Sequence, residues 1–110
     1  NTFLKGDIMS IEIKQNGDRA IVIINEKSLS DQCADQFKMH VTKLVDEGTL
    51  KIDIDLSMTD FIDSSGIGKL LYLNKKLESL SGELRIVKIT TTLLDFLDSL
   101  SINKVIKVEQ

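Results

Sequence analysis

Residues 50–71 read LKIDIDLSMTDFIDSSGIGKLL, and this stretch decides the fold because it passes from a strand pattern to a helix pattern across a polar loop. Apolar and polar residues alternate over 50–56, which is typical of a strand with one buried face. Beyond the loop, apolar residues recur at helical spacing: Ile67, Leu70, Leu71, Leu77 and Leu80. Ser64 and Ser65 therefore lie where unpaired backbone N–H groups and the positive end of a helix dipole would stabilise an added anion.

The eight residues 61–68, FIDSSGIG, closely resemble the signature of STAS domains, the anti-sigma factor antagonists and their relatives. That signature runs apolar, apolar, Asp, Ser, Ser or Thr, Gly, Leu or Ile, Gly. In the family a partner kinase phosphorylates the serine directly after the aspartate, which corresponds to Ser64 here. Ser65 takes the accompanying hydroxyl position and is the second choice for the phosphate. A helix cap worth about 1 kcal/mol is the simpler interpretation of such serines, but the ungapped match outweighs it.

Composition limits the classes of function. A chain of 110 residues with 42% apolar content and no Pro-rich or Gly/Ser-rich spacer indicates one compact domain. The formal charge of -3 and the pI near 5.1 argue against a surface that binds nucleic-acid phosphates. No apolar run approaches the roughly 20 residues that cross a bilayer, and no signal peptide is evident. We therefore expect a cytoplasmic protein without direct membrane insertion.

Cys33 is the only cysteine, which excludes an intrachain disulfide and fits a reducing cytoplasm. Its expected role is a small buried apolar side chain on a helix. The chain begins at Asn1, and Met9-Ser10 opens the first patterned segment. We therefore expect residues 1–8 to be a cloning remnant or an alternative start and residues 9–110 to form the domain.

The first half of the chain predicts a hairpin followed by a helix. The hairpin has a strand from Ile8 or Ile11 to Gln15, a tight Asn16-Gly17 turn and a second strand over 19–25. The continuous apolar run at 20–24 predicts a central strand that is covered on both faces. The helix is expected from Asp31 to about Asp46, capped by Ser30 and ended by Gly48, with Cys33, Ala34, Phe37, Val41, Leu44 and Val45 as its apolar stripe.

The second half alternates helices and strands. After the strand at 50–56, the second helix should end at Gly82, a fourth strand is marked by Leu84, Ile86 and Val87, and a third helix starts at Thr90 or Thr91 with Leu93, Leu94, Leu97 and Leu100. Val105, Ile106 and Val108 predict a terminal strand or extended tail. This order predicts a single α/β domain with a mixed sheet, an N-terminal hairpin and helices packed on the sheet. The layout resembles STAS domains from Ile11 onward, including their closing helix and final strand.

One segment departs from the family pattern. Relatives commonly have glycine and then aspartate or threonine where the second strand meets the first helix, and Lys27-Ser28-Leu29-Ser30 is the best match here. The glycine is replaced by Lys27 and the aspartate by Ser30. The resemblance implies that a carboxylate near the phosphorylatable serine is absent, so kinase recognition is altered or lost.

Rival chemistries find weaker support. Asp53-Ile54-Asp55 superficially resembles the motif of haloacid dehalogenase-like phosphatases, but both carboxylates fall within a strand, where a solvated face is the better interpretation. A Ser-His-Asp hydrolase would need His40, the sole histidine, as the base for Ser64 or Ser65, but the sequence around neither serine forms a nucleophile elbow. His40 is therefore expected on a helix surface. One histidine and one cysteine make a zinc site implausible.

The segment Gly66-Ile67-Gly68 matches neither a dinucleotide fingerprint nor a P-loop. Two interpretations stay open for its glycines: close approach of a partner's backbone, or plain turn geometry.

The leading hypothesis is a non-enzymatic switch that needs no cofactor and no metal. The resemblance implies that the unmodified protein binds an anti-sigma factor or serine kinase, that phosphorylation of Ser64 weakens the binding, and that a serine phosphatase could reverse it. The protein is expected to be a monomer or weak homodimer. Expected contacts are Ser28, Ser30, Met58, Asp60, Asp63, Ser65, Gly66, Ile67, Gly68 and Lys69. Met58 could be a partner contact or a core plug. The alternative is a STAS scaffold or accessory subunit of a sensory or transport complex without phosphorylation control.

Overall fold

A computed structural model describes residues 10–109. The expectation for residues 1–8, and Ile8 as a strand start, lie outside the described residues. The chain forms, in order, β1 (Ile11–Asn16), β2 (Arg19–Ile24), β3 (Ser28–Leu29), α1 (Asp31–Asp46), β4 (Lys51–Leu56), β5 (Phe61–Ile62), α2 (Ser64–Ser79), β6 (Glu83–Ile89), α3 (Thr91–Ser99), a 3-10 turn (Ile102–Lys104) and β7 (Lys107–Val108).

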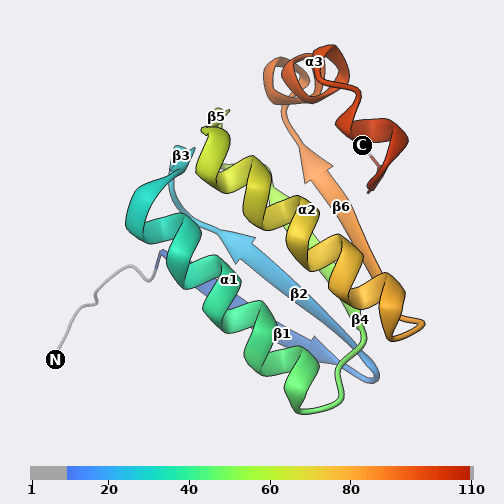
Figure 1. The fold of residues 1–110 in the computed structure, drawn as a ribbon. Coiled ribbons are helices and arrows are strands. Elements are labelled where there is room, and N and C mark those ends of the chain that lie inside the picture. Colours follow the sequence, from blue (N-terminus) through green and yellow to red (C-terminus); the bar gives the residue numbers. More distant parts are fainter. Residues whose placement is uncertain (1–9, 110) are drawn as a thin grey trace, which may run out of the picture.

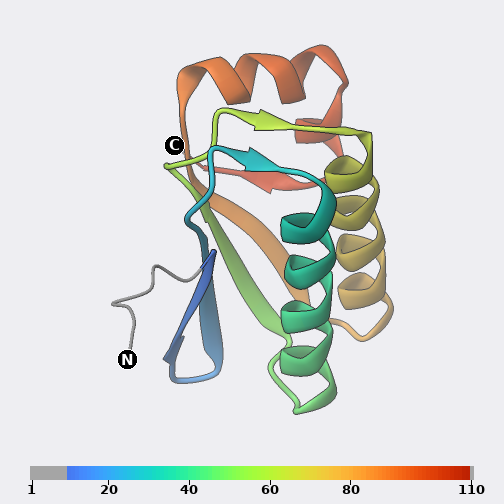
Figure 2. The ribbon, with the colours of Figure 1, turned by 90° about the vertical axis from the view of Figure 1, so that its left-hand side faces the viewer.

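Within the described residues, the main sheet has five strands in the order β1-β2-β4-β6-β7, and only the β1–β2 pair is antiparallel (Figure 1). α1 and α2 lie side by side on one face of this sheet. Figure 2 shows these two layers from the side, with β3, β5 and α3 closing the end at which the parallel strands finish. The expected mixed-sheet α/β domain with an N-terminal hairpin is confirmed.

The core lies between the sheet and the two long helices. Alternate residues of β2 (Ala20, Val22, Ile24) and β4 (Ile52, Ile54, Leu56) are fully buried on that face. They meet the apolar stripes of the helices, which are led by Phe37 and Val41 on α1 and by Leu70, Leu73 and Leu77 on α2. The period of two in the strands and the helical spacing in the helices thus meet in a single core.

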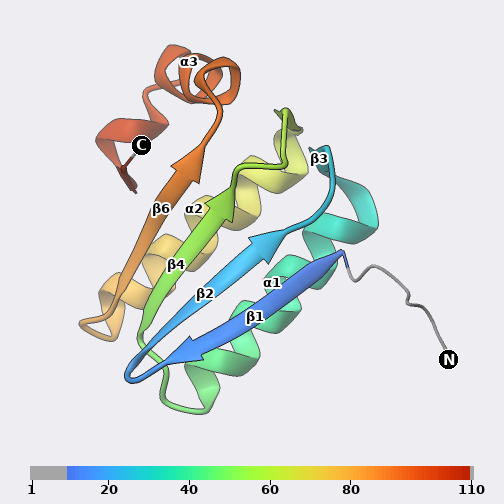
Figure 3. The same cartoon turned by 180° about the vertical axis from the view of Figure 1, so that it is seen from behind.

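The opposite face of the sheet carries no helix of the described residues (Figure 3). The prediction that β2 is covered on both faces was therefore wrong: Ile21 and Ile23 are only half-buried. β2 does lie inside the sheet, between β1 and β4.

The prediction of a solvated strand face for Asp53 and Asp55 was also wrong, since both are buried. Arg85 forms two hydrogen bonds to Asp53, from Nε to Oδ1 (2.9 Å) and from Nη2 to Oδ2 (3.0 Å), and Arg19 donates to Oδ1 as well. The two arginine side chains cover the carboxylate. Asp55 Oδ1 instead accepts from the backbone N (2.9 Å) and Oγ (2.7 Å) of Ser57, which turns the chain out of β4.

Several local predictions need correction. The hairpin turn falls at Gly17-Asp18, with Gly17 at φ +65°, rather than at Asn16-Gly17. Ser30 occupies the N-cap position of α1, but its side chain does not cap. Ser81 (φ +60°) adopts the left-handed conformation after α2, while Gly82 allows close packing, since a Cβ there would lie 2.4 Å from the carbonyl oxygen of Leu50.

Three apolar residues are less buried than the sequence suggests. Cys33 is half-buried, Leu100 and Val105 are exposed, and the closing strand begins only at Lys107. By contrast, α1 spans the predicted residues, Gly48 (φ +97°) follows its C-terminal end, and Thr90 caps α3 by accepting a hydrogen bond from the backbone N of Leu93 at 3.2 Å.

Candidate functional site

The candidate site is built around a second, two-stranded sheet that the sequence pattern did not predict. β3 pairs with β5 in parallel, with Ser28 opposite Phe61 and Leu29 opposite Ile62. Because α1 follows β3 and α2 follows β5 within one or two residues, this pairing sets the two helix starts next to each other (Figure 2). Both positive helix ends therefore face the same end of the molecule.

The loop between β4 and β5 is tied to the end of β2. Thr59 is fully buried, and its Oγ1 donates to the carbonyl oxygen of Glu26 at 2.9 Å. The backbone N of Asp60 and that of Phe61 both donate to the carbonyl oxygen of Lys27, at 2.8 and 3.1 Å. The loop that leads to the serines is thus held at both the side-chain and backbone level.

Gly66 is buried where α2 crosses β3 and β5. A Cβ at this position would lie 2.3 Å from the carbonyl oxygen of Leu29 and 2.6 Å from Cγ2 of Ile62. The contact that requires Gly66 thus comes from the chain's own β3 and β5, which neither of the two interpretations of this glycine predicted. At Gly68 a Cβ would meet no atom within 4 Å, and this glycine is exposed.

The first turn of α2 separates the roles of Asp63, Ser64 and Ser65. Asp63 is the N-cap, and its Oδ1 accepts from the backbone N of Gly66 at 2.8 Å. Ser64 is the first helical residue, is exposed, and makes no side-chain hydrogen bond within the described part of the chain. Ser65 is half-buried, and its Oγ accepts from Lys69 Nζ at 3.0 Å.

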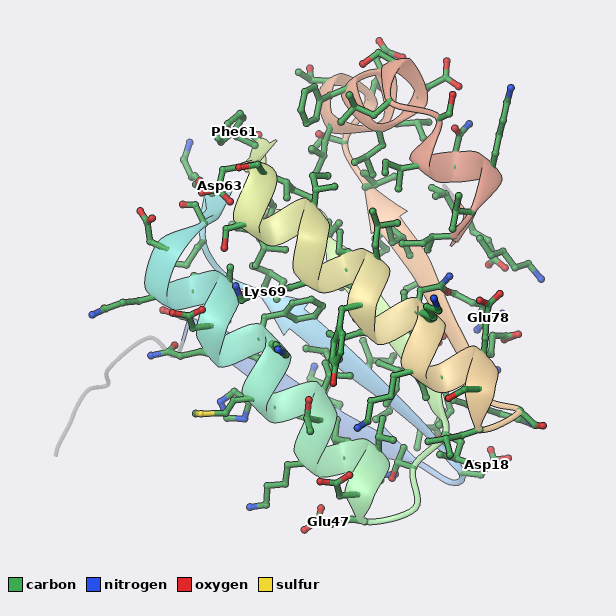
Figure 4. All side chains as sticks on the ribbon, in the orientation of Figure 1. Asp18, Glu47, Phe61, Asp63, Lys69 and Glu78 are labelled. Atoms are coloured by element: carbon green, nitrogen blue, oxygen red, sulfur yellow. The ribbon has the colours of Figure 1, made fainter. Side chains whose placement is uncertain are left out.

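Lys69 connects the serine turn to α1. Its Nζ lies 3.2 Å from Oδ1 of Asp35 while it also donates to Ser65. Figure 4 shows Asp63 at the start of α2 and Lys69 farther along the same helix, on the side that faces α1. The hydroxyl of Ser65 is therefore engaged, whereas that of Ser64 is open to solvent.

The remaining predicted contacts on the β4–β5 loop and α2 differ in how far they are exposed. Met58 is 61% exposed, so the interpretation as a core plug is excluded. Asp60 is exposed, and its Oδ2 lies 4.0 Å from Nζ of Lys27. Ile67 is half-buried against the core and offers only part of its side chain to the surface.

Ser28 and Ser30 pair with each other, Oγ to Oγ at 2.8 Å, at the edge of an open polar hollow. The hollow has a volume of about 480 Å³ and is lined by Ser10, Glu26, Ser28, Ser30, Asp31, Gln32, Cys33 and Gln36. Partial burial, and then the charge of Glu26, raise the pKa of the Cys33 thiol. Cys33 is therefore kept as the thiol and is a weak nucleophile.

Sequence reasoning missed an aromatic pair beside the serine turn. Phe61 of β5 is 51% exposed, and its ring centroid lies 6.2 Å from that of Phe96 on α3. Figure 4 places Phe61 next to Asp63. Phe61 was counted only as an apolar position of the motif, and nothing in its spacing indicates exposure because β5 is too short to show a period. Thr59 was missed because it lies in the loop before β5, where no periodic pattern indicates burial.

The residues of the rival chemistries are not gathered at a common site. Among residues 10–109 no three His, Cys, Asp or Glu side chains come together to hold a metal ion. His40 is half-buried on α1, and Asp53 is engaged by two arginines. Within the same residues, no helix is long and apolar enough to span a membrane.

A mixed sheet with an N-terminal hairpin, two helices on one face and a serine pair at the start of the second helix define a STAS-like α/β domain. The chain belongs to the STAS domain family, whose model matches residues 10–110. The match covers nearly the whole chain, so the family assignment does not rest on the serine motif alone.

Solved structures agree with this fold. The unphosphorylated form of the anti-sigma factor antagonist SpoIIAA has a TM-score of 0.76 at 15% identity, over 91% of this chain and 88% of that one. The phosphorylated form of SpoIIAA from Bacillus has a TM-score of 0.71 at 15% identity, over 91% of each chain. TM1081 from Thermotoga maritima has a TM-score of 0.81 at 24% identity, over 91% of this chain and 86% of that one.

Proposed function

We propose that this chain is an anti-sigma factor antagonist that is switched off by phosphorylation of Ser64. In its unmodified form it would bind an anti-sigma factor that is also a serine kinase. The contact would use the serine surface, which we define as Ser28, Ser30, Met58, Asp60, Asp63, Ser64, Ser65, Gly68 and Lys69. The role is regulatory and needs no catalytic residue or cofactor in this chain. The fold relationship to SpoIIAA, an anti-sigma factor antagonist with unphosphorylated and phosphorylated forms, supports the proposal.

The observation that carries the proposal is the contrast between the two serine hydroxyls. Ser64 is exposed and has no side-chain hydrogen bond in the described chain, so a kinase would break no existing interaction to reach it. Modification of Ser65 would require its hydroxyl to leave Lys69. The same contrast supports Ser64, and not Ser65, as the acceptor of the phosphate.

A phosphate on Ser64 would change the surface more than the fold. It brings about two negative charges at pH 7 to a turn that already carries Asp60 and Asp63. The positive end of α2 stabilises such a group, so the modified domain stays folded. Within a contact, however, the dianion would have to lose its water and would face these carboxylates, which weakens binding.

Mass spectrometry of the protein purified from its native host, grown with and without stress, tests the modification directly. We expect phosphate on the peptide that contains Ser64, in an amount that varies with the growth condition. Fragmentation separates Ser64 from Ser65. Well-covered peptides that never carry phosphate on Ser64 would contradict the switch.

Aspartate substitutions test the consequence for binding. We expect Ser64→Asp to reduce affinity for the anti-sigma factor by at least tenfold, about 1.4 kcal/mol, with an unchanged circular dichroism spectrum. Ser64→Ala is the matched control and should bind like the natural protein. If Ser64→Asp binds as tightly as Ser64→Ala, charge at this position does not control the contact.

The second candidate is a STAS scaffold or accessory subunit without phosphorylation control. The observation that favours it is Ser30, which occupies the position where relatives commonly have aspartate or threonine and bonds to Ser28 instead. In that case the natural protein would bind its partner but would not be phosphorylated by it. Under this second candidate, the Ser30→Asp variant should be phosphorylated on Ser64 although the natural protein is not. Under the leading proposal, the natural protein and the Ser30→Asp variant are both phosphorylated.

A further inference from the structure

β1 is an edge strand whose outer side is unpaired within residues 10–109. Among the described strands, it lies at the end of the sheet order and pairs with β2 alone (Figure 3). An unpaired edge of six residues presents a row of backbone donors and acceptors that another strand can join. The opposite edge, β7, has only two residues and offers much less.

The register of the β1–β2 pair shows which backbone groups face outward. Asn25 N donates to Ser10 O at 2.8 Å, so these opposed residues form a hydrogen-bonded pair. Hydrogen-bonded and non-bonded pairs alternate along an antiparallel ladder. Glu12 and Lys14 therefore bond to β2 through their backbone, and the N–H and C=O groups of Ile11, Ile13 and Gln15 point away from it.

The side chains of β1 point alternately to the two faces of the sheet. Ile11 is buried on the face that the helices cover, and Ile13, two residues on, is a large apolar side chain that is 38% exposed. Glu12 and Lys14 lie on the open face of the sheet and are exposed. Glu12 Oε1 accepts from Asn25 Nδ2 at 2.6 Å, which leaves its second carboxylate oxygen available.

We propose that β1 is a self-complementary interface that pairs with β1 of a second copy, antiparallel and centred on Ile13. In this register Ile13 faces Ile13 of the second copy through the outward backbone groups, and Glu12 faces Lys14 twice. These two charged pairs occupy non-hydrogen-bonded positions, where opposed side chains approach most closely. The two five-stranded sheets then form one continuous sheet around a two-fold axis.

The same charges exclude the neighbouring registers. A two-fold axis at Glu12 would set glutamate against glutamate, and an axis at Lys14 would set lysine against lysine, both of which are unfavourable. Axes at Ile11 or Gln15 shorten the paired segment and leave Glu12 and Lys14 without each other. Only the Ile13-centred register combines full overlap with opposite charges.

The proposed dimer does not depend on the proposed function. No residue of the serine surface belongs to β1, so both copies would keep that surface accessible. An interface of one strand length falls at the small end of specific interfaces, and we expect a weak dimer that forms with rising concentration.

Sedimentation equilibrium of the full chain over a wide concentration range tests the proposal. We expect the natural protein to self-associate, and Glu12→Lys and Lys14→Glu each to weaken association by about tenfold or more, because each places like charges opposite each other twice. An equimolar mixture of the two variants restores both opposite-charge pairs and should associate again. So should the double variant Glu12→Lys/Lys14→Glu.

Ile13→Pro provides an independent test on the backbone. It removes an outward N–H and no bond to β2, so the hairpin is kept while dimerisation is lost. A natural protein that stays monomeric at all concentrations overturns the proposal. A dimer that neither single reversal weakens, or variants whose mixture does not associate, overturns it too.

Hydrogen exchange at the backbone amides of Ile11, Ile13 and Gln15 should become slower as the protein concentration rises. Protection that does not depend on concentration would mean that another segment of the same chain covers the edge, and would overturn the proposal.

Discussion

Gly66 and Gly68 are separated by a single residue on α2 but have opposite surroundings. A Cβ on residue 66 would collide with the backbone of β3, whereas one on residue 68 would point into open space. We expect Gly66→Ala to lower the free energy of unfolding by about 1–3 kcal/mol, the usual cost of overpacking. Gly68→Ala should raise it by about 0.5–1 kcal/mol, because alanine favours the helix. Urea denaturation of both variants measures the difference.

The pair also separates stability from recognition. Gly68 is part of the serine surface, and its exposed place in a helix has no packing reason in the described chain. If a partner's backbone lies against it, Gly68→Ala will be more stable and yet bind the anti-sigma factor more weakly. Equal destabilisation by both alanines would contradict the close contact between Gly66 and Leu29.

At the scale of elements, one buried hydroxyl, that of Thr59, helps to hold the loop that leads into the β3–β5 pair. Thr59→Val keeps the shape but leaves the carbonyl of Glu26 without its donor, which should cost about 1–3 kcal/mol. Because the loop between β4 and β5 is then held less firmly, hydrogen exchange at the amides of Asp60 and Phe61 should become faster. Thr59→Ser keeps the hydroxyl and serves as the control. Unchanged exchange in Thr59→Val would show that the backbone bonds to Lys27 suffice.

Elements with a clear period could be predicted from sequence, and the short ones could not. The alternation in β4 and the apolar stripe of α1 each extend over several repeats, and the positions of both elements were predicted well. β3 and β5 have two residues each, which is too short for any period, and their pairing joins segments about thirty residues apart. The serine turn was found from its motif, but its support by Thr59 and Leu29 depends on that long-range pairing.

At the scale of the whole molecule, Asp53 joins the three inner strands. Arg19 from β2 and Arg85 from β6 both bond to this carboxylate of β4 on the face opposite the helices. The alternating pattern predicted the face of Asp53 correctly but not its burial, because the pattern does not show that arginines from two neighbouring strands cover it. Two glutamates extend this network. Oε2 of Glu83, at the start of β6, lies 3.3 Å from Nη2 of Arg19, and Oε2 of Glu109, just after β7, lies 3.4 Å from Nη1 of Arg85.

This network makes stability depend on pH in a defined direction. Burial alone would raise the pKa of Asp53, but the hydrogen bonds and charges of Arg85 and Arg19 outweigh it and hold the pKa below its usual value. A carboxylate whose pKa is lowered by folding stabilises the fold fully above its unfolded pKa of about 3.9. That contribution is lost as the pH falls through the folded pKa.

We therefore expect Asp53→Asn to destabilise the protein by about 3 kcal/mol at neutral pH, because it leaves two arginines facing an uncharged amide. The difference from the natural protein should shrink as the pH falls below about 4, where the Asp53 carboxylate of the unfolded chain begins to be protonated while that of the folded protein is still charged. Asp18→Asn is the matched control: Asp18 lies 3.3 Å from Lys51, but both side chains are exposed, so its loss should cost less than about 1 kcal/mol. Denaturant unfolding at several pH values compares the three proteins. A difference for Asp53→Asn that stays constant down to strongly acidic pH would mean that its cost comes from packing, and that the charge of Asp53 does not hold the three strands together.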